Sequence, residues 1–288
     1  GSPAASAKDL AGADAEPGAK APWHPFVPFD SFPYGRPRTP RDGLPSFWTQ
    51  AREPFQVRGP RYRATKAKVP SGFALYDTVG ADAVRGQRRI SGVASRLPPG
   101  AGLPVSAEAA PAWSPAWGVP RVLVVNAQIP DKPGGLFGKH PPEDAGFSLV
   151  SYHVLSARAT ELLARGEKTP SLELWRRFVQ VGASTKEGVT LKAIGRVENL
   201  SELNVPGMVK QFNAKPVLIT KSASVLKEAL PEVLEVDFDV RLWAYPARQA
   251  LVGHKDLIRQ AVVQVGYLVE GKDDAELPEQ VLAQFRMN

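Results

Sequence analysis

The chain has 288 residues, 43% of them hydrophobic, and a formal net charge of +7. This length and apolar content can build a substantial core, which excludes a fully disordered or collagen-like chain. The absence of cysteine excludes disulfide scaffolds, thiolate zinc sites and cysteine nucleophiles. No apolar run reaches the ~20 residues of a membrane-spanning helix, so we expect no transmembrane segment.

Residues 1–44 are predicted to form an extended arm. The first 20 residues are of low complexity and cannot bury enough apolar surface to fold. From residue 21 onwards prolines alternate with aromatic residues, as in an extended segment that docks onto its own domain or onto a partner. Four aromatic side chains are expected to be buried in this way: Trp23, Phe26, Phe29 and Phe32. The remaining residues, 45–288, are expected to form a single α+β domain.

Alternation of apolar and polar residues and helix-capping signals predict the elements of this domain. In chain order we expect strands at 73–79, 121–129 and 147–154, helices at 156–165 and 171–181, a strand at 189–197, a short helix at 205–213, and strands at 216–221 and 233–242. The last strand has the clearest pattern, because Val236 and Phe238 alternate with acidic residues. Runs of strands followed by helices are typical of an α+β fold with an antiparallel sheet.

A long C-terminal helix is predicted from Pro246 to about Glu270. Apolar residues recur there at helical spacing, and proline suits the first turn of a helix. We therefore expect a curved antiparallel sheet that grips this helix, an arrangement that resembles the helix-grip fold of the steroidogenic-acute-regulatory-protein-related lipid-transfer domains. Such a fold encloses a cavity for an apolar ligand between the sheet and the helix.

Several short signatures occur together and in order. They are 55–62 (FQVRGPRY), 66–69 (KAKV), 124–130 (VVNAQIP), 177–178 (RF), 209–210 (VK), 215–219 (KPVLI), 235–240 (EVDFDV), 265–271 (VGYLVEG), 276–279 (ELPE) and Arg286. Over residues 45–288 the sequence resembles the C-terminal domain of the plant "enhanced disease resistance 2" proteins. In those proteins the domain follows a pleckstrin-homology domain and a lipid-transfer domain, which residues 1–45 do not contain. The resemblance therefore implies a non-enzymatic role at membranes or with apolar ligands, and not the control of cell death by the whole plant protein.

The positive charge is concentrated in one part of the chain. Between Tyr34 and Arg96 there are thirteen basic and four acidic residues. This imbalance predicts a polyanionic partner, which could be anionic lipid, nucleic acid or an acidic protein face. No nucleic-acid recognition motif accompanies the charge. The alternative is a solvated basic surface. The residues expected to contact the membrane are Arg58, Arg61, Arg63, Lys66 and Lys68.

Four polar residues are candidates for ligand binding. Asn126 and Gln128 share one face of the strand at 121–129, where they would anchor a head group if they faced the cavity and would be solvated on the outer face. His153 could hydrogen-bond a ligand from its strand. His254 on the predicted helix would line the cavity or belong to the core. No pair of histidines has a metal-ligand spacing, so we expect no metal site.

Three carboxylates share one face of the strand at 233–242: Glu235, Asp237 and Asp239. Such a set could act as acid and base if one carboxylate sat in a protected pocket. The simpler interpretation is a solvent-facing row, or pairing with Arg241 and with basic residues of neighbouring strands.

These observations favour a non-catalytic protein, without cofactor, that binds an apolar ligand such as a lipid or an isoprenoid at a membrane surface. The alternative is a structural accessory subunit of a large organellar membrane complex, tethered by the arm. The chain begins with Gly1, which fits either an engineered remnant or loss of a targeting segment. We therefore expect a location peripheral to an intracellular membrane, in the cytosol or in an organelle such as a plastid.

Overall fold

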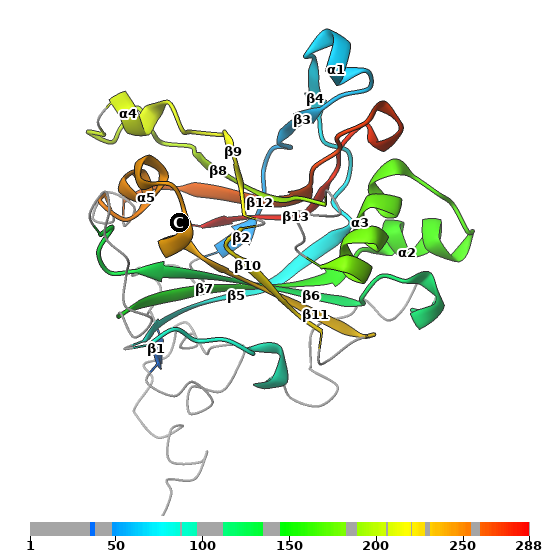
Figure 1. Cartoon of the computed structure of the whole chain (residues 1–288), viewed down its shortest axis with the longest axis horizontal. Helices are drawn as coiled ribbons and strands as arrows, with labels where there is room; N and C mark the ends of the chain where they lie inside the picture. The colour runs from blue at the N-terminus through cyan, green and yellow to red at the C-terminus, as the bar shows by residue number, and fades with distance from the viewer. Residues whose placement is uncertain are drawn as a thin grey trace, which may run out of the picture.

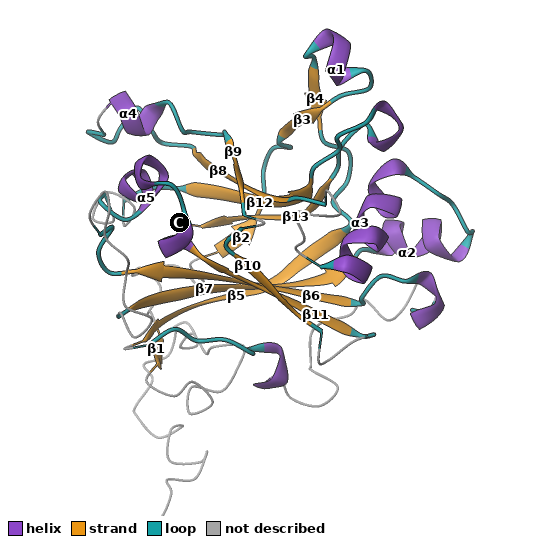
Figure 2. Ribbon diagram, in the orientation of Figure 1, coloured by secondary structure: helices purple, strands orange, loops and turns teal. Residues whose placement is uncertain are grey.

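Two β-sheets lie face to face in the computed structural model, with short helices at their margins (Figures 1 and 2). The structure describes residues 35–37, 48–86, 88–96, 112–134, 145–182, 189–205, 207–219, 221–227, 231–254 and 260–287. A third, two-stranded sheet projects from the outer side of one of the two main sheets.

The larger sheet has six strands in the order β1-β5-β7-β6-β11-β10. Its strands are β1 (Gly35–Pro37), β5 (Tyr76–Gly86), β6 (Val122–Pro130), β7 (Gly146–Leu155), β10 (Ala223–Leu226) and β11 (Val233–Asp239). Strand β11 runs parallel to β6, and the other pairs are antiparallel. The sheet is therefore mixed.

The second sheet has five antiparallel strands in the order β2-β13-β12-β8-β9. They are β2 (Trp48–Gln50), β8 (Leu191–Val197), β9 (Pro216–Leu218), β12 (Val263–Val269) and β13 (Val281–Met287). The two-stranded sheet pairs β3 (Gln56–Arg58) with β4 (Lys68–Pro70), and the four-residue helix α1 (Tyr62–Thr65) forms its tip. This hairpin stands at the top of Figure 1.

The main core fills the space between the two large sheets. It combines Leu123 and Val125 of β6 with Tyr267 of β12 and Phe285 of β13, all of them at most 1% exposed. Burying a side chain of this size contributes about 1.5–3 kcal/mol. Alternate residues of the same strands point outward, as the two-residue period of a strand requires.

The remaining elements are short helices. They are α2 (Ala157–Ala164), α3 (Pro170–Val181), α4 (Gly207–Lys210), α5 (Tyr245–Leu251) and 3-10 helices at Ala94–Arg96, Pro115–Trp117, Val240–Leu242 and Asp274–Glu276. Ser156 and Thr169 cap α2 and α3 with their hydroxyl oxygens. Trp175 of α3 is fully buried and donates to the Tyr76 hydroxyl at 2.9 Å, which fixes this helix against the core. None of the helices in the described segments has the length and apolarity needed to cross a bilayer.

The predicted helix-grip fold is wrong. Instead of one helix from Pro246 to Glu270, the described residues form the short helix α5 and then strand β12, which lies inside the five-stranded sheet. The sequence of β12 is rich in valine, whose branched Cβ is restricted in a helix and favoured in a sheet. Gly266 lets this strand pack closely against Phe55, because a Cβ at this position would lie 2.6 Å from the Phe55 ring.

Most of the other predicted elements agree with the structure. The strands expected at 121–129, 147–154 and 189–197 are β6, β7 and β8, and the two helices expected between them are α2 and α3. The strand expected at 233–242 is β11, which ends in a 3-10 helix. Strands β1, β2, β10 and β13 and the hairpin of β3 and β4 were not predicted.

Candidate functional site

The hairpin of β3, α1 and β4, residues 56–70, carries five basic residues and no acidic one. The structure places all five predicted membrane-contacting residues on it. Arg61, Arg63, Lys66 and Lys68 are exposed, and Arg58 is partly buried. We call this element the basic hairpin. Its tight tip is made by two residues with left-handed backbone angles, Arg61 (φ 58°) and Lys66 (φ 56°), on either side of α1.

The five bases differ in how far neighbouring acids neutralise them. Arg63 forms an ion pair with Asp273 at 2.9 Å, and both side chains are exposed, so this pair contributes little to stability. Arg61, Lys66 and Lys68 form no ion pair with any residue that the structure describes. The Lys66 ammonium lies 5.8 Å from the centre of the Tyr62 ring. The tip of the hairpin therefore presents cationic groups to solvent.

A buried ion-pair cluster fixes the base of the hairpin. The Arg58 guanidinium lies 2.9 Å from the Glu270 carboxylate. The Lys192 ammonium lies 2.7 Å from Glu279 and 3.5 Å from Glu270. The Glu279 carboxylate also accepts from the backbone N–H groups of Arg58 (3.2 Å) and Gly271 (3.0 Å). Two cations face two carboxylates, so the cluster is close to neutral.

A cavity of about 230 Å³ lies beside this cluster, between the basic hairpin and strands β8, β9 and β12. One part of its wall is polar: Gln56, Arg58, Tyr62, Lys68, Lys192, Glu270 and Glu279. The other part is apolar: Val57, Ile194, Pro216, Leu218 and Leu268. Leu218 is 57% exposed, which is unusual among the large hydrophobic residues that the structure describes. The cavity is therefore amphipathic and has an apolar residue at its rim.

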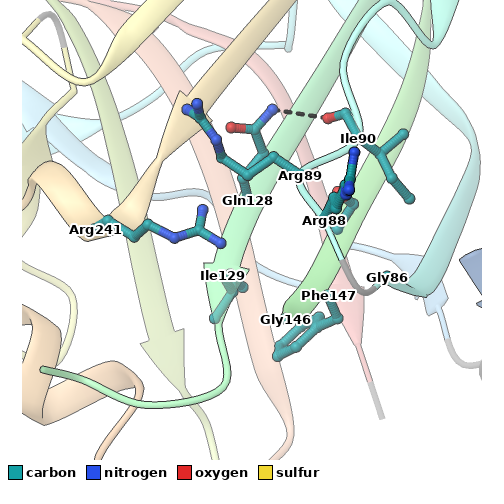
Figure 3. Close-up of a pocket in the computed structure, with 10 residues that line it drawn as sticks. Gly86, Arg88, Arg89, Ile90, Gln128, Ile129, Gly146, Phe147 and Arg241 are labelled. Carbon is teal, nitrogen blue, oxygen red and sulfur yellow. Dashed lines mark hydrogen bonds between the residues drawn. The ribbon is translucent and has the colours of Figure 1, made fainter. Parts of the chain in front are cut away.

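A second polar network lies on the outer face of the six-stranded sheet, beneath residues 88–96. The Asn126 amide donates to the Ile90 carbonyl and to Asp237, both at 2.9 Å. The Gln128 amide donates to the same carbonyl at 2.7 Å (Figure 3). Asn126 and Gln128 are therefore on the outer face but are buried there, neither facing an apolar cavity between the sheets nor solvated. They hold segment 88–96 against the sheet.

The three carboxylates of β11 belong to this network. Glu235 accepts from the backbone N–H groups of Val93 (2.9 Å) and Ala94 (2.6 Å), and Asp237 accepts from Ser91. All three carboxylate side chains are buried, so a solvent-facing row is wrong. Burial, together with the neighbouring Glu235, raises the pKa of Asp237 to about 8. This environment therefore favours the protonated form of the Asp237 carboxyl group.

Asp239, the third carboxylate of this row, forms ion pairs with two arginines. Its carboxylate lies 3.1 Å from Arg89 and 3.2 Å from Arg241, which confirms the expected pairing with Arg241. These arginines, with Arg88 and Gln128, line a cavity of only about 10 Å³ (Figure 3). That is about the volume that one water molecule requires. Segment 88–96 covers the carboxylates, and their hydrogen bonds hold this segment against the sheet.

A protein-family model described as "Protein ENHANCED DISEASE RESISTANCE 2, C-terminal" matches residues 48–288. The chain belongs to this family. No curated protein and no solved structure matched the chain. Within the part that matches the ENHANCED DISEASE RESISTANCE 2 C-terminal family, signatures that are distant in sequence lie together. Residues 55–62, 265–271 and 276–279 meet at the base of the basic hairpin, and 124–130 and 235–240 meet beneath segment 88–96.

The two candidate histidines lie elsewhere. His153 is fully buried between the sheets, where its ring nitrogens lie 2.9 Å from the hydroxyls of Thr78 and Ser151. Burial lowers the pKa of His153 to about 3, so the ring is neutral. His254 follows α5 and lies 3.0 Å from the Gln249 carbonyl. His153 is therefore a core residue with its polar atoms satisfied.

The described residues contain no cluster of three or more histidine and acidic side chains that could hold a metal ion. The predicted partner-binding residues Trp23, Phe26, Phe29 and Phe32 lie outside the described residues.

Three charged residues that organise the hairpin base were not predicted from the sequence: Lys192, Glu270 and Glu279. A weak signal existed for two of them, because Glu270 and Glu279 belong to family signatures. The sequence also indicated Lys192, because it lies between Leu191 and Ala193 in an apolar strand and a buried lysine needs a carboxylate partner.

Proposed function

We propose that this protein binds peripherally, and without catalysis, to anionic membrane surfaces through the basic hairpin. One observation carries the proposal: a projecting element of the fold bears five bases and no acid, and Arg61, Lys66 and Lys68 are exposed and form no ion pair within the described structure. Membrane attachment of this kind needs no enclosed apolar cavity, so it does not depend on the helix-grip fold that the structure overturned.

The physical basis is the negative surface potential of anionic membranes. A base near such a surface contributes about 1 kcal/mol of binding free energy, and this contribution decays within a Debye length of ~10 Å at 0.1 M salt. The hairpin projects away from the five-stranded sheet, so its tip can reach the surface first (Figure 1).

An exposed apolar residue adds to this surface. Leu218 of β9 lies at the rim of the cavity across from the hairpin, and Lys215 next to its strand is also exposed. Basic residues beside an apolar side chain are typical of proteins that lie in the membrane interface. An intracellular membrane is the proposed location. Attachment to an organellar complex through residues 1–44 stays a prediction.

The proposal is tested by making the same change of charge at two places on the protein, the basic hairpin and the end of α2. The double substitution Arg61→Glu and Lys66→Glu reverses two bases of the hairpin. The matched control, Arg165→Glu and Lys168→Glu, reverses two exposed bases at the end of α2 and beyond it. Both variants have the same net charge.

Co-sedimentation with vesicles of phosphatidylcholine and phosphatidylserine gives the readout. The hairpin variant should bind about tenfold more weakly or worse, since each lost base removes about 1 kcal/mol. The control should lose much less. Equal losses would show that net charge alone governs binding, and would contradict a role for the hairpin.

A further inference from the structure

We propose that the cavity at the base of the basic hairpin binds the polar head group of one anionic phospholipid, whose acyl chains stay in the bilayer. The head group would carry a phosphate and, beside it, a hydroxyl or ammonium donor. This inference rests on the proposed membrane function and names the ligand of the same site.

The volume of the cavity sets the size of the ligand. At about 230 Å³ it is smaller than the ~300–1,000 Å³ of pockets that enclose a drug-sized molecule. A head group fits such a space, and two acyl chains in addition do not. The cavity is therefore suited to docking on a lipid that remains in the membrane, and not to extracting one.

Lys68 supplies the phosphate contact. It lines the cavity, is exposed, and forms no ion pair with a described residue. The other two cations of the wall are already matched, because Arg58 pairs with Glu270 and Lys192 pairs with Glu279. A phosphate oxygen is the natural partner of an unmatched ammonium group.

Glu270 supplies the second contact. Its Oε1 atom lies within ion-pair distance of Arg58 and Lys192, whereas its Oε2 atom accepts no hydrogen bond from a described residue. Both oxygens of Glu279 are used, by Lys192 and by backbone N–H groups. A carboxylate oxygen with open lone pairs accepts from hydroxyl or ammonium groups. Serine, glycerol or inositol head groups offer such donors, and choline offers none.

The test uses water-soluble head groups, so that membrane attachment plays no part. Glycerophosphoserine, phosphocholine, whose choline group offers no hydroxyl or ammonium donor, and inorganic phosphate are titrated into the full chain by isothermal calorimetry or by NMR. Two variants with the same charge change are compared: Lys68→Gln, which alters the cavity wall, and Arg61→Gln, which alters the hairpin outside the cavity.

We expect glycerophosphoserine to bind more tightly than the other two probes. Lys68→Gln should weaken its binding about tenfold or more, as for loss of a charge-assisted hydrogen bond, and Arg61→Gln less than about twofold. Equal binding of the three probes, equal losses in the two variants, or no binding of glycerophosphoserine would each overturn the inference.

Vesicle binding separates this inference from the proposed function. If the wild-type chain binds phosphatidylserine and phosphatidate vesicles of equal surface charge equally well, the hairpin still acts but the cavity selects no head group, and the inference is wrong. If it binds neither in preference to phosphatidylcholine vesicles, the proposed function itself fails.

Discussion

The Lys192 ammonium lies 2.7 Å from the Glu279 carboxylate beneath the basic hairpin, and the two side chains are only 4% and 2% exposed. Glu279 also accepts the backbone N–H of Arg58, so one buried carboxylate joins the five-stranded sheet to the hairpin. The pair is 87 residues apart in the chain. The orientation of the hairpin, and hence of its bases and of the cavity, depends on this contact.

Removal of this carboxylate should be strongly destabilising. In Glu279→Ala the Lys192 charge stays buried, with Glu270 at 3.5 Å as its remaining partner, and a broken buried pair typically costs about 3–5 kcal/mol. Urea unfolding of the full chain measures the change. Arg63→Ala removes one partner of an exposed pair and should cost less than about 1 kcal/mol. Similar losses in the two variants would show that the buried cluster does not fix the hairpin.

Gly266 of β12 is predicted to be required for the seating of the hairpin stem. A methyl group there would lie 2.6 Å from the buried Phe55 ring, so Gly266→Ala should destabilise the fold by about 1–3 kcal/mol or more. Gly195 on the neighbouring strand is a matched control, because a Cβ there meets no atom within 4 Å. Gly195→Ala should stay within about 0.5 kcal/mol of wild type. Thermal or urea unfolding that ranks the two variants alike would contradict the close packing of Phe55 on β12.

The buried Asp237 carboxyl group should make stability depend on pH. Its pKa is raised from an ordinary value of 3.8 to about 8, so the folded state keeps a proton that the unfolded state releases. This contribution to stability is complete below about pH 4 and is lost as the pH rises through 8. Asn resembles the protonated acid, so Asp237→Asn should gain stability relative to wild type between pH 5 and 8.5. A stability difference that does not change over this range, in urea titrations, would contradict the protonated state.

His153 should give the opposite pH dependence. Burial lowers its pKa from 6.5 to about 3, so its contribution to stability is complete above pH 6.5. Below that pH the unfolded state takes up a proton that the folded state excludes, and stability falls by about 1.4 kcal/mol per pH unit. His153→Gln keeps groups that can hydrogen-bond Thr78 and Ser151 and removes this titration. The pH profile of unfolding should therefore be shallower for His153→Gln than for wild type below pH 6.5, and parallel profiles would refute the buried neutral ring.

Sequence periodicity predicted β11, whose two faces carry different kinds of residue, and failed for β12, where both faces carry apolar residues. In β11, Val236 and Phe238 face the core while Glu235 and Asp237 face segment 88–96, which gives a clear alternation. In β12 both faces are buried, because Tyr267 joins the main core and Leu268 contacts the hairpin stem. Its apolar residues then fit a helical stripe as well as a strand.

The candidate site was predictable from the sequence only where its residues are close together in the chain. The five bases of the hairpin are within eleven positions of one another, from Arg58 to Lys68, so their clustering is visible in the sequence. The cavity and the ion-pair cluster are not, because Arg58 and Glu279 are 221 residues apart and meet only when the sheets form. The charge pattern of the sequence therefore predicted the basic surface, whereas the carboxylates that pair with Arg58 and Lys192 became evident only from the fold.

The decisive test of membrane attachment through the basic hairpin is the binding of the full chain to vesicles as a function of salt. Raising the salt from about 0.1 M to about 1 M shortens the screening length from ~10 Å to ~3 Å. We expect binding to phosphatidylserine-containing vesicles that falls steeply over this range, and negligible binding to pure phosphatidylcholine vesicles. Equal binding to both kinds of vesicle, or binding that salt does not weaken, would contradict an electrostatic membrane contact through the basic hairpin.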